Sequence, residues 1–323
     1  MPQGISINVG LNSLDPASYG TQFTPLEGCE YDARDMNDIA LSNALPLKFA
    51  ETHLLLGKDA TSVNVINAIG NASLKLGKGD LLLFTFSGHG SQQLDPIFGD
   101  ETEDCWDERI ALYDRHLLDD ELYALWGKFN DGVRIFFIVD SCHSGTMAQL
   151  PASAAAPPAP EVSEQEQDVE QVKAAEQATA PPLKPDEGFF TDNSGEPGED
   201  SPRRLFRALP QATVNRHDAA FIEFYNSLRY LLPAKSKNAV TASVVQIAAC
   251  QDFEKALDGT RNGVFTEKLR EVWAEGAFQG TYQEFFEQIR AKTVPFRQNP
   301  NFFRVGVANA AFENQRPFTI PFP

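Results

Sequence analysis

Residues 133–140 read Val-Arg-Ile-Phe-Phe-Ile-Val-Asp, and residues 80–87 read Asp-Leu-Leu-Leu-Phe-Thr-Phe-Ser. Both are nearly continuous apolar runs of strand length, and each ends in a polar residue. Such runs are typical of strands that are buried on both faces, as in parallel sheets. Four further segments read as strands from their alternating or continuous apolar residues: 5–9, 53–56, 244–249 and 302–307.

Segments with helical periodicity lie between these strands. In the stretch 32–43, Ala33, Met36, Ile39 and Ala40 fall on one helical face. Helix candidates also lie at 60–76, 220–232, 264–277 and 282–292. Strands that alternate with helices predict an α/β fold, here a doubly wound, mostly parallel six-stranded sheet with helices on both faces.

The charge distribution sets one segment apart from the rest. The formal net charge is −18, and residues 161–200 hold twelve Asp or Glu against two Lys. The surrounding stretch 151–205 has few large apolar groups, so it cannot bury enough surface to offset the entropy of ordering. We therefore predict a flexible acidic insert at 151–205, within one domain formed by 1–150 and 206–323.

The composition also excludes several classes of function. No basic stripe is available to replace counterions on phosphate, so we expect no nucleic-acid partner. The sequence contains no run of 18 apolar residues, so we expect no membrane span. The first residues lack the features of a secretory signal, which predicts a cytoplasmic protein. A nucleotide-binding sheet lacks support, because neither G-x-G-x-x-G nor a Walker A sequence follows the first strand. The four cysteines lie far apart and read as free thiols: Cys29, Cys105, Cys142 and Cys250.

Two short motifs follow the two apolar runs. Residues 87–91 read Ser-Gly-His-Gly-Ser, and residues 140–145 read Asp-Ser-Cys-His-Ser-Gly. If the two strands are neighbours, their carboxyl ends lie about 5 Å apart, at the edge where open α/β sheets bind ligands. A thiol beside an imidazole suits acyl transfer, with Cys142 as nucleophile and His89 as general acid and base. The amides of Gly90 and Cys142 are the candidates for an oxyanion hole.

Plainer interpretations of the same residues exist. A cysteine after a buried strand is often a small packed hydrophobe, and a histidine in a glycine-rich turn is often only a turn residue. His143 is a rival base, although adjacent residues in a tight turn rarely point at the same atom. The placement of Cys142 and His89 after two candidate neighbouring strands favours the catalytic interpretation.

The blocks 87–92 and 140–146 resemble the signature blocks of metacaspases and orthocaspases, within the caspase-like cysteine peptidases of family C14. Other stretches resemble the family in the expected order: 26–33, 107–108, 119–121, 249–252 and 262–266. The resemblance covers roughly residues 4–150 and 240–310. It implies a caspase-like fold in which 1–150 corresponds to the large (p20) subunit and 206–323 to the small (p10) subunit.

The resemblance implies hydrolysis of polypeptides after Arg or Lys. The positions that match the family's acidic pocket for the P1 side chain are Asp32 and Asp140, with Cys29 and Ser87 lining it. Two carboxylates at the base of a pocket would select guanidinium or ammonium groups and reject acidic ones. Asp32 could instead be a helix N-cap or a first-turn helix acid, and Asp140 a strand-end residue that bonds its own turn.

The family often requires calcium, and the matching positions here are Asp107, Asp119 and Asp120. Carboxylate oxygens suit this cation. The family's fourth acid, a few residues after the nucleophile, is replaced here by Gln149. Residues 100–121 contain ten Asp or Glu against Arg109 and Arg115, a pattern that is also typical of a solvated loop.

Many relatives cut themselves between the two subunit regions. Basic residues in or beside the predicted insert offer sites for such a cut: Lys173, Lys184, Arg203, Arg204 and Arg207. The insert could equally be a tether or an inhibitory segment. The resemblance to metacaspases also favours a monomer. Two other functions stay open: a non-catalytic caspase-like scaffold that binds partners, and a cysteine peptidase of the same clan with another P1 preference.

Overall fold

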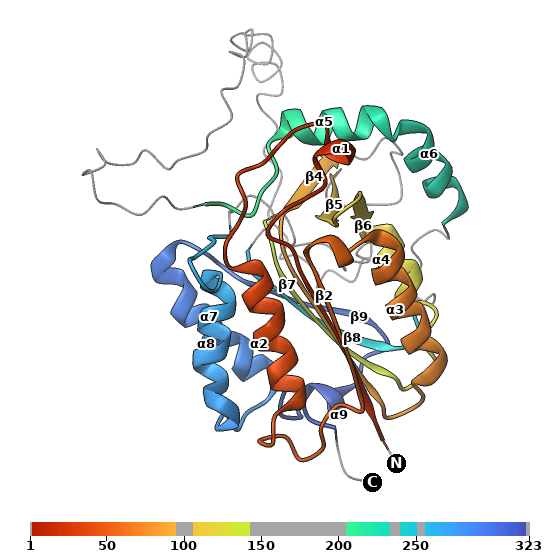
Figure 1. Cartoon of the computed structure of the whole chain (residues 1–323). Helices are drawn as coiled ribbons and strands as arrows, with labels where there is room; N and C mark the ends of the chain where they lie inside the picture. Colours follow the sequence, from red (N-terminus) through yellow and green to blue (C-terminus); the bar gives the residue numbers. More distant parts are fainter. Residues whose placement is uncertain (1, 95–105, 143–204, 233–239, 251–255, 321–323) are drawn as a thin grey trace, which may run out of the picture.

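The computed structural model describes residues 2–94, 106–142, 205–232, 240–250 and 256–320 (Figure 1). Its main sheet has six strands in the order β2-β1-β3-β7-β8-β9. All neighbouring strands in it are parallel except β8 and β9. The strands are β1 Gly4–Gly10, β2 Glu51–Leu56, β3 Leu81–Ser87, β7 Arg134–Asp140, β8 Ser243–Ala248 and β9 Asn301–Gly306. The predicted mostly parallel six-stranded sheet is therefore confirmed.

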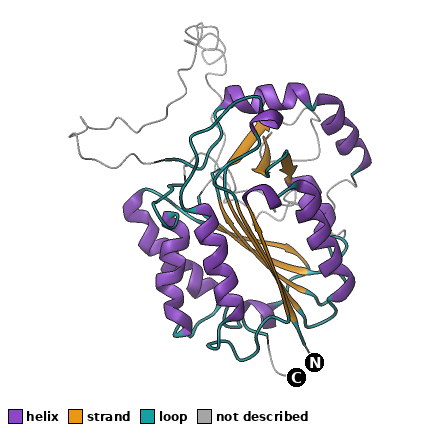
Figure 2. Ribbon diagram, in the orientation of Figure 1, coloured by secondary structure: helices purple, strands orange, loops and turns teal. Residues whose placement is uncertain are grey.

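The side chains of the central strands alternate between two buried clusters, one on each face of the sheet. In β3, Leu82, Phe84 and Phe86 join one cluster, whereas Leu81 and Leu83 join the other. Helices cover both faces, as Figure 2 shows. This double coverage explains why the sequences of β3 and β7 are nearly continuously apolar rather than alternating.

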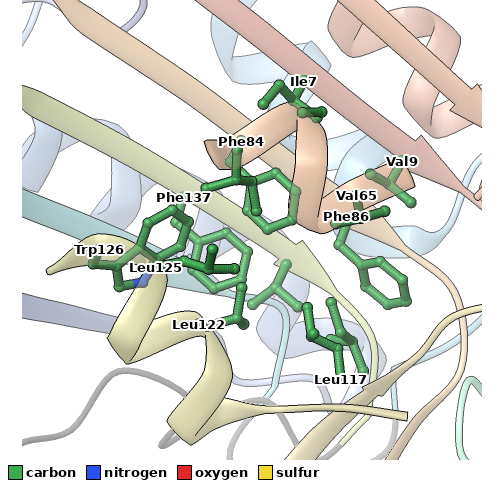
Figure 3. Close-up of a cluster of buried hydrophobic side chains, with 14 of the residues drawn as sticks. Ile7, Val9, Val65, Phe84, Phe86, Leu117, Leu122, Leu125, Trp126 and Phe137 are labelled. Carbon is green, nitrogen blue, oxygen red and sulfur yellow. The ribbon is translucent and has the colours of Figure 1, made fainter. Parts of the chain in front are cut away.

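One face of the sheet is covered by α3 (Ser62–Lys75) and α4 (Asp119–Trp126). Figure 3 shows Leu122, Leu125 and Trp126 of α4 beside the aromatic rings of Phe84 and Phe137. The Trp126 and Phe84 rings meet edge to face, with centroids 5.8 Å apart. Such contacts fix α4 on the sheet, and through it the chain that leads into β7.

The opposite face is covered by α2 (Cys29–Leu41), α7 (Val264–Trp273) and α8 (Tyr282–Thr293) (Figure 1). The predicted helix over 264–277 ends earlier than expected. Ala274 adopts a left-handed backbone with φ 48°, which stops α7 and starts a short 3-10 turn at Ala274–Gly276. Because α2 and α7 both begin at the carboxyl edge of the sheet, their first turns can contribute to a site there.

A second, antiparallel sheet was not predicted. It consists of β4 (Gly90–Leu94), β5 (Trp106–Ala111) and β6 (His116–Leu118). The helix α5 (Gln211–Ala220) lies beside β4, and α6 (Ile222–Leu231) follows it, close to the predicted helix at 220–232 (Figure 1). The remaining helical pieces are short: α1 Pro16–Tyr19, α9 Ala310–Glu313 and 3-10 turns at Gly57–Asp59 and Val294–Phe296.

The predicted acidic insert, except Leu205, lies outside the described residues. Within the described part of the chain, no helix has both the length and the apolar character needed to cross a bilayer.

Candidate active site

The two motif-bearing strands are neighbours in the sheet. Ser87 at the end of β3 is in register with Asp140 at the end of β7. The Gly88 amide donates a hydrogen bond to the Asp140 carbonyl at 3.3 Å, which ties the two turns together. His89 and Cys142 each lie two residues beyond a strand end, so the structure brings them to the same edge, as expected.

A stretch of the chain that begins with the last residue of the predicted insert lies across this edge. We call residues 205–209 the covering segment. Phe206 forms an antiparallel bridge with Leu257, and Ala208 forms a parallel bridge with Gly90. The Arg207 amide donates to the Ala256 carbonyl at 3.1 Å. The covering segment is therefore extended and main-chain bonded on two sides, the mode in which a peptide is bound by strand addition.

The carbonyl oxygen of Arg207 accepts two hydrogen bonds. The Gly90 amide donates to it at 2.9 Å, and the Cys142 amide donates to it at 3.2 Å. These are the two amides that the sequence suggested as oxyanion donors. Position 90 requires glycine, because a Cβ atom there would lie 1.9 Å from the Cys142 carbonyl oxygen.

The guanidinium of Arg207 is fully buried among three carboxylates, which we call the carboxylate cluster: Asp32, Asp140 and Asp258. Nη2 donates to Asp32 Oδ2 at 2.7 Å and to Asp258 Oδ1 at 2.8 Å, and Nη1 lies 2.9 Å from Asp140 Oδ2. Nε donates to Asp258 Oδ1 at 3.2 Å. This distribution uses the planar fork of arginine, which a lysine ammonium cannot reproduce.

Neighbouring groups hold these carboxylates in place. Ser87 Oγ donates to Asp32 Oδ2 at 2.8 Å and accepts from Arg207 Nη1 at 2.9 Å. Thr266 Oγ1 donates to Asp140 Oδ2 at 2.7 Å, and Asn262 Nδ2 donates to Asp32 Oδ1 at 2.8 Å. Cys29 is buried beside them, and burial raises the pKa of its thiol far above the ordinary value.

The carboxylate cluster carries more negative charge than one guanidinium neutralises. Burial raises the pKa of Asp32 to about 7, against the opposing effect of Arg207. Burial likewise opposes the charge of Arg207, but Asp140, Asp32 and Asp258 hold its pKa well above the ordinary value. A cluster of this charge is suited to cationic side chains and would repel anionic ones.

Cys142 and His89 do not share a hydrogen bond in this structure. The Ala256 amide donates to Cys142 Sγ at 2.9 Å, and the thiol is fully buried. Neither ring nitrogen of His89 has a hydrogen-bond partner among the described residues, and burial lowers the pKa of His89 to about 4. A neutral imidazole with a free nitrogen can accept a proton, and catalytic contacts often tighten only during reaction.

Sequence reasoning missed Asp258, Thr266 and Asn262 as parts of this site. The stretch 262–266 had been noted only for its resemblance to the small-subunit region. Asp258 lies between Leu257 and Gly259 with no motif around it, and it meets Arg207 only through the fold. The sequence offers Arg207 as a cleavage site, but nothing in it indicates that Arg207 occupies the pocket.

The structure only partly describes the expected calcium residues. Asp107 lies in β5, and Asp119 and Asp120 begin α4 directly after β6, which pairs with β5. The backbone thus brings the three positions to one end of the small sheet, but the Asp107 side chain and Gln149 lie outside what is described. Among the described residues, the group with metal-ligand spacing is a different one: His116, His217 and Asp218.

Comparison with known proteins places the chain in a family. The family model of the caspase domain, peptidase family C14, matches residues 16–311. Metacaspase-2 of Arabidopsis thaliana and metacaspase-1A of Aspergillus fumigatus are each 33% identical over 147 residues, which is 42% of this chain and 34% of each relative. A crystal structure of protein GSU0716 from Geobacter sulfurreducens is similar with a TM-score of 0.73 and 36% identity, over 99% of this chain and 100% of that one.

Arg207 is thus bound on two sides at the carboxyl edge of the sheet, close to a cysteine and a histidine. The chain belongs to the caspase domain family, peptidase family C14. It spans about a third of the length of the curated metacaspases that it matches.

Proposed function

We propose that this protein is a cysteine endopeptidase that hydrolyses peptide bonds after Arg or Lys. One observation carries the proposal. The Arg207 carbonyl accepts from the Gly90 and Cys142 amides while the Arg207 side chain ends in the carboxylate cluster. A residue held at both its carbonyl and its cationic side chain is held as the P1 residue of a substrate would be.

The chemistry assigns one task to each group. His89 takes the proton of the Cys142 thiol, and the thiolate attacks the P1 carbonyl carbon. The C–N electrons leave with the departing amine, which takes that proton from His89. The developing oxyanion lies between the Gly90 and Cys142 amides, and each such donor contributes about 3 kcal/mol in the transition state. Water then attacks the thioester and gives a proton to His89. The P1 carboxyl group is released, and the expelled Cys142 thiolate takes the proton back from His89.

The carboxylate cluster accounts for the choice of P1 residue. Arginine reaches the three carboxylates through three nitrogens: Nη2 to Asp32 and Asp258, Nε to Asp258, and Nη1 to Asp140. A lysine has only one nitrogen. Because a hydrogen bond to a charged group contributes about 1.5–3 kcal/mol, we expect Arg to exceed Lys by about tenfold or more. Peptide bonds after acidic P1 residues should not be cleaved.

We propose that the first bond cut is that between Arg207 and Ala208 in the same chain. Of the five basic residues considered as cleavage sites, Arg207 is the one that the structure describes, and it already occupies the position of a P1 residue. Its cleavage needs no docking step, which lowers the entropic part of the barrier.

The test combines two readouts on the full chain. Wild type should hydrolyse an Arg-P1 fluorogenic peptide and yield a fragment that begins at Ala208 in mass spectrometry. Cys142→Ala should do neither, whereas Cys250→Ala, another buried free thiol, should retain both. Equal activity in wild type and Cys142→Ala would falsify the assignment of the nucleophile.

We also propose that calcium, held by Asp107, Asp119 and Asp120, supports activity. Hard oxygen donors at one end of the small sheet support this proposal. Bound there, the cation would add positive charge next to β5 and β6. The test is direct calcium binding by titration calorimetry, with Asp119→Asn and Asp120→Asn expected to weaken it, together with activity in the presence of a chelator.

The compartment and the oligomeric state complete the proposal. We propose a monomer in the cytoplasm that acts on polypeptide substrates. The three described cysteines are free thiols, which fits a reducing compartment. Light scattering after gel filtration should give the mass of one chain.

A further inference from the structure

The chain after Arg207 is an integral part of the fold. Leu209 is only 7% exposed and Val214, in α5, is 1% exposed, and both belong to the buried cluster that also contains Phe84 and Trp126. The Leu209 amide donates to the Gly90 carbonyl at 3.0 Å. The chain on the C-terminal side of the candidate scissile bond, from Ala208 through α5, is therefore packed into the core and is not a free tail. We call it the leaving side.

Buried polar contacts fix α5 in the same place. Asp218 accepts from Arg109 Nη1 of β5 at 2.7 Å, and Arg109 is 1% exposed. His217 lies between the Ser18 carbonyl at 3.0 Å and the Tyr225 hydroxyl at 3.0 Å. At the surface, Arg216 Nη1 donates to the Gly20 carbonyl at 2.8 Å. None of these contacts involves the bond after Arg207, so they would survive its cleavage.

We propose that α5 holds the leaving side in place after cleavage, so that cutting the chain at Arg207 does not by itself open the site. This inference rests on the proposed function and adds a second step to it. The activating event is the departure of α5 and Ala208 from β4 and β5, and the Arg109–Asp218 ion pair is a buried contact that resists it.

The chemistry explains why retention matters. Attack by Cys142 forms a thioester to Arg207 and frees the amino group of Ala208, which takes a proton from His89. If that amine stays beside the thioester, it can return the proton to His89 and attack the same carbonyl carbon, which restores the peptide bond and expels the thiolate. An amine held in place competes strongly with water, because effective molarities of held groups are very high. Hydrolysis of the thioester is faster than re-formation of the peptide bond only when the amine moves away.

Retention of the leaving side also prevents other polypeptides from binding at the site. Ala208 and Leu209 occupy the main-chain positions along Gly90 that residues after a scissile bond would need. Arg207 at the same time fills the carboxylate cluster. A molecule that is cut but still holds α5 should therefore be a poor peptidase.

The test compares wild type with Asp218→Asn, which weakens the hold on α5 without touching the site. Glu313→Gln is the matched control, since it also replaces a carboxylate that pairs with an arginine, Arg304 on β9. Self-cleavage is followed by mass spectrometry, peptidase activity is expressed per cleaved molecule, and the labelling rate of Cys142 by iodoacetamide reports its accessibility.

In wild type and Glu313→Gln, we expect self-cleavage to level off with intact chain remaining. In Asp218→Asn, cleavage should go further, and activity and labelling per cleaved molecule should rise about tenfold or more. If Asp218→Asn does not fold, Arg216→Ala removes a surface contact of α5 and should act in the same direction.

Two failures can be told apart. In the first, wild type cleaves itself completely, and its peptidase activity per cleaved molecule equals that of a folded variant with weakened α5 contacts. The retention step is then wrong, and the proposed function stands. If none of the proteins cuts itself or an Arg-P1 peptide, and Cys142 is labelled no faster in the variant, both are wrong.

Discussion

Gly263 and the guanidinium of Arg207 are in such close contact that a Cβ atom at position 263 would lie 2.5 Å from Cζ of Arg207. The backbone at Gly263 is extended, with φ −61° and ψ 153°, so alanine can adopt it without strain. The glycine is thus required by the space that an arginine side chain occupies, and not by backbone geometry.

Gly263→Ala should therefore displace Arg207 and exclude arginine substrates. We expect kcat/KM for an Arg-P1 peptide to fall by about 100-fold, because a methyl group and the guanidinium cannot share the space. Gly70→Ala is the matched control, since nothing lies within 4 Å of a Cβ atom at that helical position. A normal rate in Gly263→Ala would show that substrates bind elsewhere.

Asp258→Asn should reduce the preference for arginine over lysine. Asp258 binds both Nε and Nη2 of Arg207, and loss of its charge weakens two hydrogen bonds that only arginine makes together. We expect kcat/KM for an Arg-P1 peptide to fall by about 10–100-fold, and for the Lys-P1 peptide by less. Asp38→Asn, an exposed acid on α2, should leave both rates and their ratio unchanged.

Arg207→Gln should remove the fragment that begins at Ala208. A site built to bind a guanidinium rejects a neutral amide strongly, so cleavage at this bond should fall by about 100-fold or more. Without a cation, the covering segment should leave the carboxylate cluster, and Cys142 of the uncut variant should then be labelled faster than Cys142 of uncut wild type. Continued formation of the Ala208 fragment at the wild-type rate would contradict the role of the pocket.

His116 should make stability depend on pH. It is fully buried, and neither ring nitrogen makes a hydrogen bond to the described residues, although Nδ1 lies 3.7 Å from Asp218 Oδ1. Burial lowers its pKa from 6.5 to about 4, against the opposing effect of Asp218. Between pH 6.5 and 4 the unfolded chain holds a proton on this ring that the folded chain lacks. The contribution of His116 to stability is therefore complete above pH 6.5, and it is lost as the pH falls to 4, at about 1.4 kcal/mol per pH unit.

The comparison with His116→Gln isolates this effect. Both proteins should carry Cys142→Ala so that neither cuts itself, and the free energy of unfolding is measured in urea at several pH values. The difference between the two proteins should shift in favour of His116→Gln as the pH falls. A difference that is constant from pH 7 to 4.5 would show that His116 keeps an ordinary pKa in the folded state.

The central sheet could be predicted because the pattern of apolar residues that identifies its strands is local in the sequence. The runs at 80–87 and 133–140 are nearly continuously apolar because both faces of their strands are covered. This local pattern identifies buried parallel strands without reference to distant residues. The adjacency of β3 and β7 then follows from the fold class, and it brings Cys142 and His89 to one edge.

The small sheet and α5 could not be predicted because their burial depends on distant partners. The helix α5 exposes most of its residues, and its buried groups include His217 and Asp218, which no hydrophobic pattern reveals. Asp218 is buried only because Arg109, over a hundred residues earlier in the chain, meets it. The same holds for Asp258, whose role exists only once Arg207 lies beside it.

The position of Arg207 has a consequence for the kinetics of the molecule. Because the candidate cleavage site and Cys142 belong to one chain and are already in contact, the first cut should be a first-order reaction. Its half-time should be the same at nanomolar and micromolar protein, and an added competitor peptide should slow it little. The timing of that cut would then be set when the chain folds, and not by how much of the protein has accumulated.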